Sequence, residues 1–235
     1  MKKLWSIFLA AAAFIVSADD LSTEDFMARV RSDRSVETYA KLTGVLQHKR
    51  LNEKAISLPL YVGLIIQKNI STGQLVLDDE FYLIGQSQAP GTKTVLPMQK
   101  TTEKLDNSGL QASDLTLSFI YDPILKEEEK TRLRGVISCR VIRFKSTERD
   151  EEIRVFIAEN YFFPLKAEFF KPGEDKPYRV LEIVSFEQKN NLYYASTIRL
   201  EGPGWRTRID FDTEKADLGV YNRQDPPDIM KKRSL

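Results

Sequence analysis

The chain of 235 residues contains a single cysteine and a single histidine. Cys139 alone permits no disulfide within the chain, and it lies in an apolar, strand-like run where a free cysteine usually packs as a small buried side chain. His48 alone excludes metal sites that are built from several imidazoles, and a Ser-His-Asp triad would depend on that one residue. Because His48 lies at the polar end of a strand-like run, we expect its ring to be solvated.

Other features of catalytic sites are also scarce. No glycine-rich phosphate-binding loop follows a predicted strand. Carboxylates are plentiful, but nothing in their spacing singles out a pair of the kind that hydrolyses glycosides. The sequence therefore predicts a protein that is not an enzyme and that uses neither a metal nor a cofactor.

The chain has no excess of charge of one sign. It contains 35 basic and 34 acidic residues, and removal of Lys2 and Lys3 with the N-terminal segment leaves 33 basic residues against 34 acidic ones. Nucleic-acid binding depends on many uncompensated Lys and Arg contacts with phosphates. We therefore expect no nucleic-acid partner.

The N-terminal segment Met1–Ala18 has the three parts of a secretory signal peptide. Two lysines are followed by a predominantly apolar run, Leu4–Val16, and then by the small residues Ser17 and Ala18. A membrane-spanning helix would need about 20 apolar residues. We expect cleavage after Ala18 and export of residues 19–235. No cysteine follows the run, so we expect no lipid anchor at the new N-terminus.

Residues 19–235 have a suitable length for a single domain. The first predicted element of this domain is a helix, Leu21–Arg31, with Ser22 as N-cap and Asp25 three positions further on. Strands are predicted next at Thr38–Gln47, Ser57–Gln67 and Gly73–Ile84.

The segment Gln86–Asp114 contains turn-forming Pro, Gly and Asn residues and little alternation of apolar and polar side chains. Loops of this length are usually functional or disordered. A short apolar helix is predicted to follow, with Ser113 as its cap. At the other end of the chain, residues 230–235 are expected to form a disordered tail.

From Arg134 onward, apolar residues alternate along short runs that turn residues separate. Connections this short imply antiparallel neighbours, because parallel strands need crossover segments of a dozen residues or more. The predicted strands are Val136–Lys145, Ile153–Ala158, Leu165–Lys171, Tyr178–Glu187, Leu192–Glu201 and Trp205–Thr213.

One hairpin corner is unusually aromatic. Corners are normally polar, yet Tyr161, Phe162 and Phe163 follow one another immediately before a strand in which Leu165 and Phe169 belong to the predicted apolar face. The three rings are either ordinary core residues or residues that cover the rim of a cavity.

These runs resemble LolA-like outer-membrane lipoprotein-sorting proteins. The family pattern "LPL(K/R)xEFY" is similar to FPLKAEFF at Phe163–Phe170, and its "(P)TxIxL" strand is similar to STIRL at Ser196–Leu200. The segment GLQASDLTLSFI, Gly109–Ile120, resembles the loop and short helix of the family, although Leu115 and Phe119 make it more apolar. The similarity is clearest over residues 110–213.

The resemblance implies an α+β fold that is mainly antiparallel β: a curved, incomplete (half) β-barrel with helices and loops covering its concave apolar face. It also implies a periplasmic carrier that binds hydrophobic acyl chains for lipoprotein sorting to the outer membrane. Its partners would be lipoprotein acyl chains or another lipid, and a membrane complex or outer-membrane acceptor protein. The alternative is a non-enzymatic periplasmic sensor or protein-interaction module on the same fold. We expect a monomer.

On this interpretation, the short helix and the sheet line the ligand cavity together. In a helix that begins near Asp114, Leu115 and Phe119 are four positions apart and share one face. The segment Gln86–Phe119 is expected to move and to open the cavity. The predicted lining and lid residues are Leu115, Leu117, Phe119, Val155, Ile157, Tyr161, Phe162, Phe163, Leu165 and Phe169.

Overall fold

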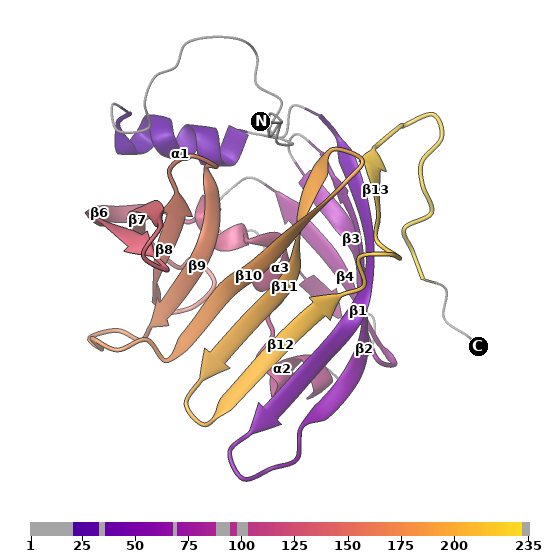
Figure 1. Ribbon diagram of the computed structural model, residues 1–235, viewed down its shortest axis with the longest axis horizontal. Helices are drawn as coiled ribbons and strands as arrows, with labels where there is room; N and C mark the ends of the chain where they lie inside the picture. Colours follow the sequence, from indigo (N-terminus) through magenta and orange to yellow (C-terminus); the bar gives the residue numbers. More distant parts are fainter. Residues whose placement is uncertain (1–20, 33–35, 68–69, 88–94, 98–102, 232–235) are drawn as a thin grey trace.

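The computed structural model describes residues 21–32, 36–67, 70–87, 95–97 and 103–231. Within these ranges the strands form one curved antiparallel sheet, with short helices against its concave side (Figure 1). The predicted α+β fold with an incomplete barrel is therefore confirmed. The expected signal peptide lies outside the described residues.

The elements of the described ranges follow one another along the chain with few long connections. The helical elements are α1 (Thr23–Ser32), α2 (Glu103–Ser108), α3 (Ala112–Thr116) and the 3-10 helix η2 (Ser118–Tyr121). The strands are β1 (Thr38–Arg50), β2 (Ile56–Ile66), β3 (Ile70–Leu77), β4 (Glu80–Ser87), β5 (Val95–Pro97), β6 (Ile124–Leu133), β7 (Ile137–Lys145), β8 (Glu152–Ala158), β9 (Phe163–Phe170), β10 (Arg179–Lys189), β11 (Leu192–Gly202), β12 (Trp205–Phe211) and β13 (Asp217–Val220).

The topology of the sheet explains why helices lie on its concave face. The strand order is β5-β4-β3-β2-β1-β12-β11-β10-β9-β8-β7-β6, with β13 also paired to β1. The chain runs outward from β1 to β5 and returns from β6 inward to β12, so β5 and β6 are the two edges. The connection between these edges has to pass over the sheet, and it carries α2, α3 and η2 along the concave side (Figure 1).

The predicted strands of the C-terminal half correspond to β7–β12, each within two residues at either end. The single strand predicted at Gly73–Ile84 is wrong, because β3 and β4 form a hairpin there. Asp78 turns the chain with a φ of 56°, and its N–H donates to the carbonyl of Pro59 at 2.8 Å. Aspartate tolerates this left-handed conformation, so two acidic residues are enough to form the turn.

The sequence pattern does not predict β6, although it has ten residues. Most of its side chains are charged, and they give no alternation of apolar and polar positions. β6 is an edge of the sheet, and charged residues on an edge strand prevent further strands from pairing with it. β6 therefore lacks the alternation of apolar and polar residues that marks a half-buried strand, because it is an edge strand.

Helix α1 begins as predicted. The Ser22 hydroxyl accepts a hydrogen bond from the Asp25 N–H at 3.1 Å and donates to the Asp25 carboxylate at 2.8 Å. Phe26 is fully buried on the core side of the helix, and the guanidinium of Arg140 lies 4.4 Å from the centre of its ring. Arg140 also donates to the Leu21 carbonyl at 3.0 Å, so β7 fixes the start of the helix.

The segment after β13 lies against the face of β2 and β3 that points away from the helices. The Tyr61 hydroxyl donates to the Ile229 carbonyl at 2.6 Å, and the Lys231 N–H donates to the Gln74 side chain at 2.7 Å. Gly63 permits this approach, because a Cβ there would lie 2.1 Å from the Ile229 oxygen. We expected residues 230–235 to form a disordered tail, but this contact holds Lys231 in place. Residues 232–235 lie outside the described ranges.

Cys139 is buried in β7, as expected, and this burial raises the pKa of its thiol. The expectation that His48 is solvated is wrong, because the residue is only 5% exposed. Its Nδ1 lies 2.8 Å from the Thr207 hydroxyl, which itself donates to the Ser108 carbonyl. Nδ1 therefore carries the proton, and Nε2 is a buried acceptor without a partner in the described part of the chain.

The burial of His48 makes stability dependent on pH. Burial, and next the positive charge of Arg50, lower the pKa of His48 below its ordinary value near 6.5. The unfolded chain then binds the proton more readily, so the stabilisation is complete above about pH 6.5 and is lost as the pH falls through the folded pKa. We expect urea midpoints to fall from pH 7.5 to pH 5, and His48→Gln to remove part of that slope. An NMR titration of this histidine that gave an ordinary pKa would contradict the prediction.

Candidate ligand-binding site

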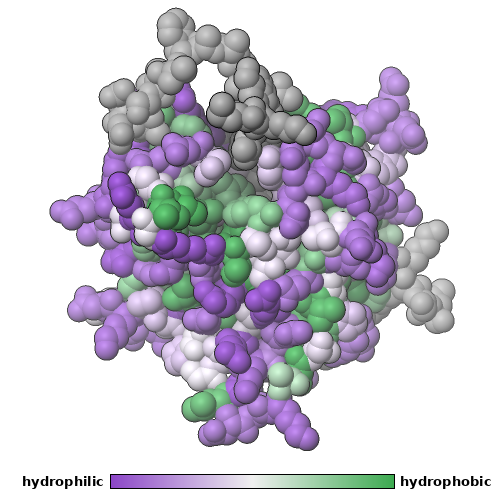
Figure 2. Space-filling model, viewed as in Figure 1, coloured by the Kyte–Doolittle hydropathy of each residue, from purple (hydrophilic) through white to green (hydrophobic). Residues whose placement is uncertain are grey.

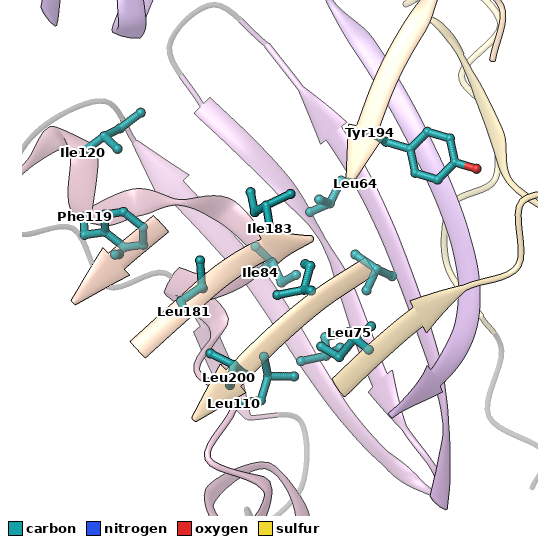
Figure 3. Packing of buried hydrophobic residues seen from close by; sticks show 14 of the residues in the cluster. Leu64, Leu75, Ile84, Leu110, Phe119, Ile120, Leu181, Ile183, Tyr194 and Leu200 are labelled. Carbon is teal, nitrogen blue, oxygen red and sulfur yellow. The ribbon is translucent and has the colours of Figure 1, made fainter. Parts of the chain in front are cut away.

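The concave face of the sheet is lined with apolar side chains from both halves of the chain. They form one cluster with the apolar residues of the helices, here called the inner cluster. In Figure 3, side chains from β2–β4 face those from β10 and β11 across the space between the two halves. The residues that the sheet contributes to the inner cluster include Leu64, Leu75, Ile84, Val155, Ile157, Phe169, Leu181, Ile183 and Leu200.

The segment Glu103–Tyr121, here called the plug, covers this apolar face. Its three helical elements are too short to be stable alone, so burial of their apolar side chains has to hold them. Leu110 is 2% exposed and Phe119 is 3% exposed, and both pack into the inner cluster. The Phe119 and Phe169 rings pack in a T-shaped arrangement with 5.9 Å between ring centres. The plug thus places a second apolar surface against that of the sheet.

The continuous short helix predicted from Asp114 is wrong. Helix α3 begins earlier, after Gln111 rather than with Ser113 as its cap, and it ends at Leu117, which has a left-handed φ of 52°. A residue in this conformation is a common end to a helix, and η2 then starts in a new direction. Leu115 and Phe119 therefore do not share a face of one helix, although both pack against the inner cluster.

A buried ion pair ties α3 to β10. The Arg179 guanidinium donates to the Asp114 carboxylate, and their side chains are 3% and 0% exposed. Asp114 also accepts from the Gln111 N–H at 2.7 Å, so the same carboxylate caps α3. The Arg179 guanidinium lies 4.5 Å from the centre of the Phe169 ring, which places the charge directly beside the inner cluster.

Further polar contacts tie the remaining parts of the plug. The buried Glu80 carboxylate on β4 accepts from the Lys104 N–H at 3.2 Å, at the start of α2. Arg31, in the last turn of α1, donates to the Ile120 carbonyl at 2.8 Å in η2. The plug is therefore attached to both halves of the sheet and to α1 by a few discrete polar contacts.

The structure brings several predicted site residues together. Val155 and Ile157 of β8 and Phe169 of β9 are almost fully buried in the inner cluster, and Phe119 meets Phe169 there. Leu115 and Leu117 are partly buried and pack against the same cluster.

The three rings of the aromatic corner, Tyr161, Phe162 and Phe163, lie in different surroundings. Tyr161 is 51% exposed and points away from the core. Phe162 turns the chain with a φ of 51°, and its ring packs against Phe26 of α1 with 5.3 Å between ring centres. Phe163 packs edge-on against Phe186 of β10, at 5.2 Å. Two of the rings thus connect the corner to α1 and to β10.

Phe163 lies where the sheet is interrupted. β9 pairs with β10 only between Phe169 and Lys166, so the first residues of β9 have no partner in β10. The guanidinium of Arg134 bonds to β10 there, donating to the Ile183 and Val184 carbonyls at 3.1 Å each. Phe163 contacts clusters on both faces of the sheet, which is possible because the two strands separate at this point.

The alternation of apolar residues predicts that Leu165 shares a face with Ala167 and Phe169. The structure shows that it does not. It packs in a smaller cluster on the opposite face of β7–β9, with Cys139, Val141, Phe156 and Ala158. The pairing of β8 with β9 contains a β-bulge between Phe156 and Ile157. A bulge places an extra residue in one strand, so the alternation of faces changes there and Leu165 moves to the other side.

Figure 2 shows mostly hydrophilic residues along the outline of the face that it draws, with several hydrophobic residues exposed nearer the centre. No cluster of three or more His, Cys, Asp or Glu side chains in the described ranges could hold a metal ion. Among the described residues, no helix is both long enough and apolar enough to cross a membrane.

Comparison with known proteins shows which solved structures have a similar fold. No model of a protein family matches the chain, and no curated protein matches its sequence. A DUF1329 family protein from Desulfovibrio piger aligns with a TM-score of 0.62 and 15% identity, over 83% of this chain and 90% of that one. A putative outer membrane lipoprotein-sorting protein domain from Vibrio parahaemolyticus aligns with a TM-score of 0.55 and 12% identity, over the same shares of the two chains.

A LolA superfamily protein from Nitrosomonas europaea aligns with a TM-score of 0.50 and 10% identity, over 90% of this chain and 98% of that one. The protein has a LolA-like fold. The resemblance noted in its C-terminal strands thus extends to the architecture of most of the chain. At these identities the likeness concerns the LolA-like fold alone, and the site has to be argued from the residues of this protein.

Proposed function

We propose that the protein is an exported, non-enzymatic carrier that binds hydrophobic acyl chains on the concave face of its LolA-like fold. The observation that carries this proposal is the construction of the inner cluster. One of its two surfaces is the curved sheet, and the other is a plug of short helices that discrete polar contacts hold in place. Displacement of the plug would present an apolar groove of the size of the sheet to a ligand.

Burial of methylene groups gives sufficient affinity for such a ligand. Each buried CH₂ contributes about 0.8 kcal/mol, so ten of them contribute roughly 8 kcal/mol before the costs of association. That free energy corresponds to a Kd of roughly micromolar. The ligand would be kept out of water and could still be passed on. No charge or metal is required for this binding.

The lipoprotein-sorting description of the Vibrio parahaemolyticus structure supports acyl chains of lipoproteins as the cargo. In that case the partners are a membrane complex that releases the lipoprotein and an outer-membrane acceptor. The protein would act in the periplasm as a monomer. The acyl chain would contact six of the predicted residues, all of which pack in or against the inner cluster: Leu115, Leu117, Phe119, Val155, Ile157 and Phe169.

The proposal is tested by extracting the purified protein with organic solvent and analysing the extract by mass spectrometry. We expect acyl lipids in near-stoichiometric amounts, and saturable binding of a fluorescent fatty-acyl probe after their removal. Val45→Asp, on an exposed position of β1, should bind the probe like the wild type. Absence of both lipid and probe binding would overturn the proposal and would favour the alternative, a sensor or interaction module.

Export predicts a defined N-terminus. Because the segment Met1–Ala18 has the composition of a signal peptide, protein recovered from the periplasm should begin at Asp19. A variant in which Ala10 and Ala12 are both replaced by Lys interrupts the apolar run and should accumulate uncleaved in the cytoplasm. Periplasmic protein that began at Met1 would contradict the prediction.

A further inference from the structure

A cavity of about 270 Å³ lies where α2 and α3 of the plug meet β10 and β12. Three arginines line it, Arg50, Arg149 and Arg179. Its other walls include the aromatic rings of Tyr178 and Trp205. The proposed function assigns no role to this cavity.

The carboxylates around the cavity leave two of its arginines without a partner of opposite charge. Asp114 is paired with Arg179, and Glu151 accepts from the Tyr178 hydroxyl at 2.5 Å. Asp106 is the acidic residue in the wall. Among the described residues, neither Arg50 nor Arg149 forms an ion pair, and the Arg50 guanidinium donates to the carbonyl and the side-chain oxygen of the neutral Asn107, each at 3.4 Å.

Arg179 contributes a further donor. Its side chain is 3% exposed, and its Nη1 is buried without a hydrogen-bond partner in the described part of the chain. A buried donor without an acceptor destabilises the protein. Arg179 is part of the wall, so a small shift of its side chain would let an anion in the cavity supply the acceptor that this group lacks.

The cavity also borders the apolar interior. Leu110 belongs both to its wall and to the inner cluster. The Trp205 ring is held between Gly109 and Gly202, where added Cβ atoms would lie 2.5 and 2.4 Å from it. The cavity therefore combines a cationic rim with an apolar floor that is continuous with the covered face of the sheet.

We propose that this cavity binds a carboxylate or phosphate group through Arg50, Arg149 and Arg179. The group is either the head of a lipid whose chain lies in the inner cluster or a free anion. The first case rests on the proposed function and specifies its ligand as an anionic amphiphile. Arginine is well suited to this role, because its planar fork forms paired hydrogen bonds with either group.

The test compares dodecanoate with dodecanol, which have the same chain and differ in the head. Each is titrated at pH 7.5 into lipid-free protein against the fluorescent fatty-acyl probe. We expect dodecanoate to bind about tenfold more tightly or better, as one or two charge-assisted hydrogen bonds provide. In the double variant Arg50→Gln/Arg149→Gln this preference should fall to about one, with dodecanol unaffected.

The matched control is Arg132→Gln/Arg208→Gln, which removes the same charge from exposed strand positions. It should keep the full preference for dodecanoate; equal loss in both double variants would overturn the inference, since net charge would then explain it. Equal binding of dodecanoate and dodecanol by the wild type would overturn the lipid-head assignment and leave the carrier function intact.

Calorimetric titration with inorganic phosphate tests the free anion separately. Phosphate binding that the Arg50→Gln/Arg149→Gln variant loses would support a free-anion site, even if no acyl compound binds and the carrier function fails. If neither phosphate nor dodecanoate depends on these arginines, the cavity is not an anion site.

Discussion

Replacing Arg179 by methionine is expected to lower the free energy of unfolding by about 3–5 kcal/mol, the cost of leaving one member of a buried ion pair alone. The Asp114 carboxylate would keep its hydrogen bond from the Gln111 N–H but would lose its only ion-pair partner in the described structure. Methionine fills a similar volume, so a cavity should add little to the loss. Urea denaturation followed by circular dichroism measures the difference.

The matching variant is Arg179→Met combined with Asp114→Asn. The asparagine oxygen can still accept from the Gln111 N–H, but it carries no charge that has to be compensated. Replacing both members of a buried pair is often close to neutral, so we expect the double variant to recover most of the stability that Arg179→Met loses. If the double variant is as unstable as the single one, the ion pair is not the origin of the effect.

The same variants report on the role of the plug. When Arg179 is replaced, hydrogen exchange should accelerate more in Glu103–Tyr121 than in β11 and β12, because local opening of the plug then costs less than global unfolding. Uptake of the acyl probe should become faster in parallel. Faster exchange without faster uptake would mean that the plug does not control access to the apolar face.

The sequence predicted those parts of the fold in which one face of a strand is buried. In β7–β12 the apolar residues alternate, and the alternation fixes both the strands and their short turns. Leu181, Ile183 and Leu200 carry the same signal, and it could have located the inner face on β10 and β11. β6 escaped prediction because an edge strand does not need an apolar face.

The candidate site was harder to predict, because its polar residues meet only in the folded protein. Asp114 and Arg179 are 65 positions apart, and neither stands out in its own segment. His48 looks like a polar strand end, yet β12 and Ser108 of the plug bury it. Of the plug, Leu115, Leu117 and Phe119 are predicted as site residues, whereas the buried Leu110 is not. The left-handed conformation of Leu117 is not predicted either, since leucine rarely adopts it.

Local irregularity limited the prediction of faces as well. Strict alternation assigns Leu165 to the same side as Phe169, but Leu165 is the extra residue of a β-bulge in β9, and its side chain lies on the opposite side. A single extra residue thus removes one predicted lining residue from the inner cluster without altering the strand. Tyr161 is exposed for a similar reason, because the turn at Phe162 directs consecutive side chains apart.

Phe119→Asp is expected to abolish binding of the fluorescent acyl probe while the protein remains folded. Phe119 lies on the plug and meets Phe169 across the proposed binding surface, so the new carboxylate would be placed beside the acyl chain. A charge in apolar surroundings is costly unless it is paired. In the absence of ligand, the plug can relax and expose the carboxylate to water, which limits the loss of stability. Probe titration and thermal unfolding measure the two effects.

Ile157→Asp provides the comparison, because Ile157 is fully buried on a strand of the sheet, β8, and cannot relax in this way. It should lower the melting temperature much more than Phe119→Asp does. Leu125→Asp, at a position that is 48% exposed, adds the same charge and should alter neither binding nor stability. Normal probe binding by Phe119→Asp would place the ligand elsewhere. Unfolding as complete as that of Ile157→Asp would show that Phe119 is part of the structural core, and that the plug is fixed to the sheet rather than displaced by a ligand.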